Sequence, residues 1–139
     1  MNIKSLKIED YKNLDIELIH NSDIIALIGN NGSGKSNLLE ALSLIFKSLY
    51  KKSETVSFDY CIEYENTNRR KIRIEKKKTK ITFKFDDVVA INIDEFLPKK
   101  VVAIYSGEED RLWTKIYFPI YEDFVRSIIR SSITGIYLY

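Results

Sequence analysis

The amino-acid sequence predicts an α/β fold with parallel core strands and an antiparallel β-subdomain. Residues 24–28 form an apolar run without alternation, which is typical of a parallel strand covered on both faces. Apolar side chains then recur at helical spacing between residues 38 and 49. Beyond this helix the period changes to two, because apolar and polar side chains alternate in residues 56–64 and in two later runs.

Two further strands are expected before the apolar run. Ile3, Leu6 and Ile8 indicate the first, and residues 14–18 alternate apolar with acidic side chains, which indicates a half-buried second strand. Residues 10–13 between them have the composition of a turn.

The chain after the helix is expected to form a meander and then return to the central sheet. The helix begins near Lys35 and ends by residues 51–52, where two lysines suit a helix C-terminus. The three alternating runs of the meander are residues 56–64, 72–74 and 81–85, and residues 88–93 indicate a further strand.

Two more elements are predicted nearer the C-terminus. Residues 101–105 form a second unalternating apolar run, typical of a central parallel strand. A helix is predicted from residue 108 to about residue 130, bent or broken at Pro119.

Composition excludes several classes of protein. The 139 residues are 45% hydrophobic and carry a net charge of +2, which is ordinary for one globular domain or one lobe of a larger one, and too small a charge to indicate nucleic acid by itself. Cys61 is the single cysteine, so no internal disulfide is possible. No stretch is as long as a membrane span, so we expect a cytoplasmic protein without a membrane partner.

Residues 29–36, Gly-Asn-Asn-Gly-Ser-Gly-Lys-Ser, match the phosphate-binding pattern G-x-x-x-x-G-K-[ST] in full. Glycines let the backbone approach a phosphate closely, successive amides form an anion nest, and the following helix adds the positive end of its dipole. We expect Lys35 between the β- and γ-phosphates of ATP or GTP, and the Ser36 hydroxyl on Mg²⁺. The alternative is a glycine-rich turn that holds no nucleotide. The residues predicted to bind the cofactor here are Asn30, Asn31, Gly32, Ser33, Gly34, Lys35, Ser36 and Asn37.

Two stretches resemble the N-terminus of SMC/RecF/OLD-type ABC ATPases. They are Leu-Lys-Ile-Glu-Asp-Tyr-Lys-Asn-Leu at residues 6–14 and Ile-Ala-Leu-Ile-Gly-Asn-Asn-Gly-Ser-Gly-Lys-Ser-Asn-Leu-Leu-Glu-Ala-Leu at residues 25–42. The resemblance implies a P-loop NTPase fold, the N-terminal lobe of an ABC ATPase head, with ATP and Mg²⁺ as cofactors. It implies a second head as partner and action on DNA in repair, chromosome maintenance or phage defence. It also makes Lys12 and Asn13, in the turn before the P-loop, candidate nucleotide contacts, with a solvated turn as the alternative.

Other elements of that family are missing from the sequence. No glutamine is present to sense the γ-phosphate, so Ser106 or Glu108 would have to substitute. The Ser-Gly-Gly signature is absent, and His20 precedes the P-loop and so is not the switch histidine of the family. We therefore expect residues 1–139 to be a single incomplete ATPase lobe that needs its C-terminal half or a second head for hydrolysis. Its expected parts are residues 1–52 with the P-loop, 53–97 with the meander, and 98–139 with the return strand and helical segment.

Three alternatives remain open. The chain could be a nucleotide-binding or interaction module that does not hydrolyse ATP. It could also be a compact P-loop enzyme in which Asp94 holds Mg²⁺ through water and Glu95 activates the attacking water, although no catalytic residue is assured. Finally, eight basic residues between Arg69 and Lys80 could contact DNA, or they could form the solvated face of the meander.

Overall fold

The computed structural model describes residues 1–22, 24–99, 101, 114, 118–119, 121–123 and 125–126. The chain divides into two units, Met1–Val102 and Ala103–Tyr139. In the second unit the described residues 118–119, 121–123 and 125–126 are helical, within the helix predicted there. The predicted strand at 101–105 lies outside the described residues apart from Val101.

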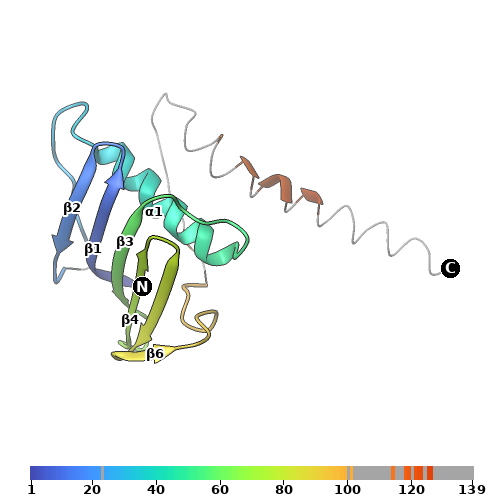
Figure 1. The fold of residues 1–139 in the computed structure, drawn as a ribbon. Helices are drawn as coiled ribbons and strands as arrows, with labels where there is room; N and C mark the ends of the chain where they lie inside the picture. Colours follow the sequence, from blue (N-terminus) through green and yellow to red (C-terminus); the bar gives the residue numbers. More distant parts are fainter. Residues whose placement is uncertain are drawn as a thin grey trace. The chain divides into compact units, whose positions relative to one another are not determined.

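The first unit contains one antiparallel sheet with the strand order β2-β1-β3-β4-β5-β6, and the helix α1 covers one face of it (Figure 1). The elements are β1 (Asn2–Tyr11), β2 (Leu14–Ile19), α1 (Lys35–Tyr50), β3 (Asp59–Glu65), β4 (Lys71–Lys77), β5 (Lys80–Phe85) and β6 (Val88–Ala90). The expected meander is therefore confirmed as β3, β4 and β5.

The N-terminal hairpin belongs to the same sheet as the meander. β1 pairs with β2 on one side and with β3 on the other, so Leu6 lies opposite both Leu18 and Ile62. Ile62 in turn lies opposite Ile74. This register places apolar side chains from four strands in one row on the side that α1 covers, which explains why the alternation in the sequence is so regular.

The core forms between this row and the apolar stripe of α1. Ala41 and Ile45 of the helix are fully buried, as are Ile8, Ile62 and Ile74 of the sheet. Burial of each such side chain stabilises the fold by about 1.5–3 kcal/mol relative to its exposure to water. The apolar side chains at helical spacing thus pack α1 against the sheet. This packing also fixes the position of the N-terminus of the helix.

The expected strand at residues 24–28 is not found. These residues adopt no regular structure, and Ile24 and Ile28 are 83% and 95% exposed. A strand that is buried on both faces needs paired neighbours and covering elements. All six strands of the described residues belong to the antiparallel sheet, so none of them pairs with this run and the expected parallel core is not seen.

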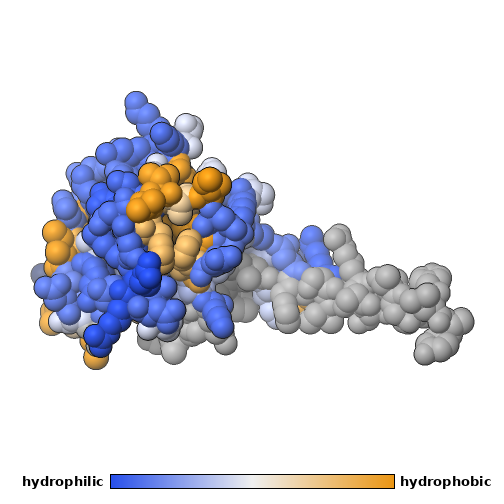
Figure 2. Space-filling view, turned by 90° about the horizontal axis from the view of Figure 1, so that it is seen from below, coloured by the Kyte–Doolittle hydropathy of each residue, from blue (hydrophilic) through white to orange (hydrophobic). Residues whose placement is uncertain are grey.

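Apolar side chains are also exposed at the last strand of the sheet. Val88 and Val89 of β6 are 70% and 65% exposed, and Ile91 just after it is fully exposed. Figure 2, the view from below, shows an apolar patch surrounded by hydrophilic residues. The strand expected over residues 88–93 ends at Ala90.

Candidate nucleotide-binding site

The loop before α1 has the backbone that a phosphate cradle requires. Gly32 and Gly34 have φ angles of 85° and 93°, a left-handed conformation that strains any residue with a β-carbon. Gly34 is the N-cap of α1 and makes no side-chain cap, and the first turn of the helix contains no acidic residue. The N-terminal amides of α1 therefore keep their donors and their positive partial charge without an acceptor from a capping side chain.

Lys35 folds back over the same loop. Its Nζ donates hydrogen bonds to the carbonyl oxygens of Gly29 and Asn30, at 2.5 and 2.8 Å, and to Ser33 Oγ at 3.2 Å. A β-carbon added to Gly29 would stand 2.7 Å from Ser33 Oγ and 4.0 Å from Lys35 Nζ. Gly29 therefore keeps the inside of the loop open, and Lys35 supplies its positive charge, so these residues fit a bound phosphate.

The Ser36 side chain is the one that the P-loop pattern assigns to the metal. It lies in the first turn of α1 and is partly exposed. A hydroxyl oxygen is a suitable ligand for the hard cation Mg²⁺. The position and chemistry of Ser36 thus fit the magnesium ion that accompanies a nucleotide.

The turn between β1 and β2 contacts the P-loop and the start of α1. Asn37 Nδ2 donates a hydrogen bond to Asn13 Oδ1 at 2.6 Å, and Asn13 Nδ2 donates to the carbonyl oxygen of Gly32 at 3.4 Å. Lys12 Nζ forms an ion pair with Glu40, which lies in the second turn of the helix. The structure therefore brings Asn13 and Asn37 together with the loop, and it connects Lys12 to the second turn of α1.

The sequence reasoning missed one residue of this group, Glu40. A glutamate at position 40 lies among apolar residues of the helix, and Glu40 is only 3% exposed. A buried carboxylate requires a partner, which here includes Lys12 from a distant turn. The charged residue inside an apolar stripe was the signal that could have identified it.

Asp94 and Glu95, the two candidate catalytic acids, lie away from the start of α1. Asp94 forms an ion pair with Lys52 at 2.8 Å, and Lys52 lies two residues beyond Tyr50, the last residue of the helix. Sixteen helical residues span about 24 Å at 1.5 Å per residue. The described residues therefore do not bring Asp94 together with Ser36, and a compact enzyme that uses this pair gains no support.

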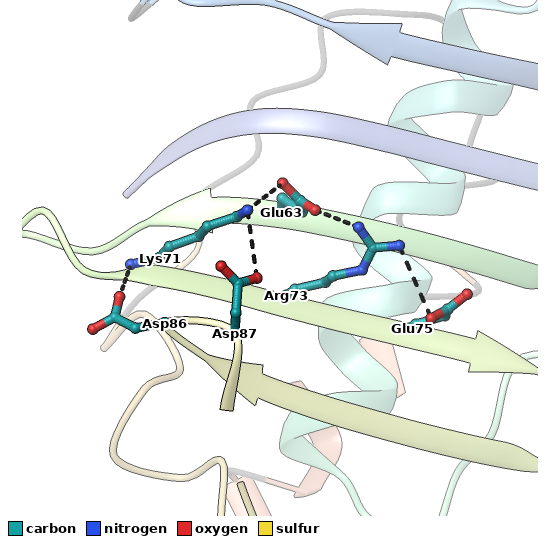
Figure 3. Close-up of polar contacts among 6 residues, drawn as sticks. All are labelled: Glu63, Lys71, Arg73, Glu75, Asp86 and Asp87. Atoms are coloured by element: carbon teal, nitrogen blue, oxygen red, sulfur yellow. Dashed lines mark hydrogen bonds and ion pairs between the residues drawn. The ribbon is translucent and has the colours of Figure 1, made fainter. Parts of the chain in front are cut away.

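The basic cluster of the meander is largely neutralised by ion pairs, most of which lie on the open face of the sheet. Glu63 accepts a hydrogen bond from Arg73 Nη1 at 2.5 Å and lies 3.6 Å from Lys71 Nζ (Figure 3). Lys71 is also 3.7 Å from Asp87, and Arg73 is 4.0 Å from Glu75. Further members of the cluster with acidic partners are Arg70, Lys76 and Lys77. This arrangement favours the solvated-face interpretation over a DNA contact.

These ion pairs shift the pKa values of the groups that form them. The hydrogen bond to Glu63 raises the pKa of Arg73. The hydrogen bond from Lys77 lowers the pKa of Glu75, and the backbone amide of Lys71 lowers the pKa of Asp86. Each shift favours the charged form of the group, so the open face is a network of fixed, mutually compensating charges.

One basic residue of the cluster does not lie on the open face. Lys76 is 4% exposed, and its Nζ donates a hydrogen bond to the carbonyl oxygen of Phe58 at 3.0 Å. The strand period explains this, because Lys76 follows Ile72 and Ile74 on the core-facing side of β4. The ammonium group of Lys76 is therefore not accessible to a partner in solution.

None of the helices in the described part of the chain is both long enough and apolar enough to span a membrane.

The sequence is similar to those of known ATPase-domain and RecF proteins. A family model for the AAA ATPase domain matches residues 1–134. The DNA replication and repair protein RecF of Rickettsia akari (strain Hartford) is 40% identical over 67 residues, which are 43% of this chain and 19% of the relative. The RecF protein of Rickettsia bellii (strain OSU 85-389) is 40% identical over 65 residues, 46% of this chain and 18% of the relative. That of Rickettsia massiliae (strain Mtu5) is 49% identical over 45 residues, 32% of this chain and 12% of the relative.

The matched part is therefore less than a fifth of the length of each of these relatives. The resemblance to the N-terminus of SMC/RecF/OLD-type ABC ATPases is confirmed by the RecF matches and by the family model. Because that model matches nearly the whole sequence, the chain belongs to the AAA ATPase domain family.

Proposed function

We propose that this chain is the ATP-binding N-terminal lobe of a RecF-like ATPase that works in DNA replication and repair. The observation that carries the proposal is the loop of residues 29–36. Its left-handed glycines, its uncapped helix N-terminus and the inward-folded Lys35 form one positively charged cradle. The role in DNA replication and repair is supported by the similarity to proteins named DNA replication and repair protein RecF.

The residues of the loop have separate tasks in this proposal. The amides that begin α1 and the Lys35 ammonium bind the phosphates and stabilise the negative charge that grows on the transferred phosphoryl group. Ser36 holds Mg²⁺, which supplies Lewis-acid charge to the phosphate oxygens. Asn13 braces the loop from the side through its hydrogen bonds to Gly32 and Asn37.

Hydrolysis is proposed to need residues that this lobe does not supply. Asp94 is engaged with Lys52 beyond the C-terminal end of α1, so it does not provide the carboxylate that the metal and the attacking water require. The missing groups would come from the C-terminal half of the ATPase or from a second head. The same observation favours a second candidate function, a nucleotide-dependent binding module without hydrolysis. Release of phosphate in a single-turnover assay of the chain by itself would contradict both the need for groups from elsewhere and the binding module without hydrolysis.

DNA is the proposed partner of the assembled ATPase, and a cytoplasmic location accompanies that role. The ion-paired face in Figure 3 is not the proposed contact, because the carboxylates of Glu63, Glu75 and Asp87 stand among its basic groups and would repel the DNA phosphates. Fluorescence anisotropy with labelled duplex DNA tests this, and Arg73→Gln should leave the DNA affinity unchanged. A large loss of DNA affinity in Arg73→Gln would instead indicate that this face contacts DNA.

Calorimetric titration with Mg-ATP tests the central proposal. We expect the wild-type chain to bind and Lys35→Ala to lose binding, because its ammonium is the nearest positive side chain of the loop. Lys52→Ala, a lysine just beyond the other end of the same helix, is the matched control and should bind as the wild type does. Equal affinity of Lys35→Ala and the wild type would refute the proposal.

A further inference from the structure

Glu40 is a buried carboxylate on the helix that begins at the phosphate loop. Its side chain is 4% exposed, and its partners include the ammonium group of Lys12. An ionised carboxylate at this depth is costly unless a cation and hydrogen bonds compensate it. Leu38 and Ala41, the neighbouring buried residues of α1, are apolar, so Glu40 is a charged residue among core positions.

Glu40 faces the same turn as two residues of the candidate site. Residues three and four apart share a face of a helix, so Glu40 lies beside Asn37 and Ser36 on α1. Asn37 already contacts the turn through Asn13. The pair of Glu40 with Lys12 is therefore a second connection between the turn and the first two turns of the helix, made by a charge rather than an amide.

Lys12 is held but not enclosed. Its backbone is left-handed, with a φ angle of 54°, next to an irregularity in the pairing of β1 with β2. Its Nζ lies 5.2 Å from the centre of the Tyr11 ring, and its side chain remains 33% exposed. An ammonium group has three donors, so its contact with one oxygen of Glu40 does not use all of them. The neighbouring Asn13 of the same turn donates a hydrogen bond to the carbonyl oxygen of Gly32 in the P-loop.

We propose that Glu40 is a positioning residue that, through Lys12, holds a second cation beside the phosphate loop for the phosphates of the bound nucleotide. The proposal rests on the nucleotide-binding function proposed above. Glu40 touches no phosphate itself. Its carboxylate sets the place of the Lys12 ammonium, while Lys35 supplies the first cation from inside the loop.

A double-mutant cycle with Mg-ATP separates this role from a purely structural one. We expect Lys12→Met to weaken binding about tenfold, the usual loss for one charge-assisted hydrogen bond. Glu40→Gln should weaken binding to a similar extent although Lys12 is present. The double variant should bind no worse than Lys12→Met alone, since Glu40 acts only through that lysine. Lys12→Arg, which keeps the charge, should stay close to the wild type.

Several results would overturn the proposal. A purely structural Glu40 would lower affinity as much in the Lys12→Met background as in the wild type, or not at all. Thermal unfolding of each variant shows whether it remains folded, and Glu54→Gln, an ion-paired glutamate beyond the far end of α1, is the matched control that should bind normally. If Glu40→Gln does not fold, the affinity of Lys12→Met for Mg-ATP is the remaining test. An affinity equal to that of the wild type would contradict the proposal.

The outcome also distinguishes this inference from the function on which it rests. Binding by the wild type and its loss in Lys35→Ala, together with normal binding by Glu40→Gln, would leave the nucleotide site intact and remove the role of Glu40. Absence of binding by the wild type would overturn both.

Discussion

Leu14 lies directly against Gly34, so a β-carbon added to Gly34 would stand 2.9 Å from Leu14 Cδ2. Leu14 begins β2 and is 5% exposed, whereas Gly34 is the N-cap of α1. The sheet and the phosphate loop therefore meet at a contact that leaves no room for a side chain. The hairpin of β1 and β2 therefore packs against the loop through Leu14, and the conformation of the loop depends on this contact.

Gly34→Ala should destabilise the protein more than Gly32→Ala. Both glycines have left-handed backbones, so each alanine costs about 1–2 kcal/mol of strain. Only the alanine at position 34 meets a buried side chain, which adds about 1 kcal/mol or more of overpacking, whereas a β-carbon at Gly32 meets nothing within 4 Å. Urea unfolding measures the difference. Equal free energies of unfolding for the two variants would show that the Leu14 contact is unimportant.

Glu95→Gln should leave nucleotide binding and any nucleotide hydrolysis unchanged. Its neighbour Asp94 pairs with Lys52, just after the helix whose first turn holds Ser36, so this acidic pair lies far from the phosphates. A phosphate-release assay on the assembled ATPase proposed above, with Lys35→Ala as the inactive control, checks this. Selective loss of hydrolysis in Glu95→Gln, with normal ATP affinity, would instead support the compact enzyme.

Ile74→Ala should lower the free energy of unfolding by about 2–5 kcal/mol, because it removes a fully buried side chain and leaves a cavity between β4 and α1. Val89→Ala on β6 is the control, since Val89 is 65% exposed and its change should stay within about 0.5 kcal/mol. Denaturant unfolding followed by circular dichroism gives both values. A small effect at Ile74 would mean that helix and sheet do not share one core.

Acid should destabilise the folded chain. The pKa of Glu54 is lowered mainly by its hydrogen bond with Lys47, that of Glu75 by Lys77, and that of Asp86 by the backbone amide of Lys71. A folded-state pKa below the unfolded value means that the unfolded chain binds more protons, so stability rises with pH in that range. The stabilisation is present above the ordinary values of 4.5 for Glu and 3.8 for Asp and is lost as the pH falls below them.

Unfolding in urea at a series of pH values between about 7 and 3 measures this slope. The variant Glu54→Gln/Glu75→Gln/Asp86→Asn should show a shallower slope than the wild type over the same range. An unchanged slope would assign the acid sensitivity to other carboxylates. These groups are half-buried or exposed, so added salt should weaken the effect as well.

Local patterns in the sequence were sufficient to predict the helix, the meander and the phosphate loop. Helical spacing from Leu38 onward and alternation in β3, β4 and β5 are short-range properties, since each residue's face follows from its position along its own element. The glycine-rich loop is likewise local, because its conformation depends on residues that lack a β-carbon.

Only the tertiary structure showed what those elements meet. The pair of Lys12 with Glu40 joins residues 28 positions apart, and β1 enters the sheet between β2 and β3, which no periodicity could indicate. The apolar run at residues 24–28 misled the prediction for the same reason. Apolar composition states what a segment would gain from burial, but burial requires neighbours, and these are supplied by the arrangement of the whole chain rather than by the segment itself.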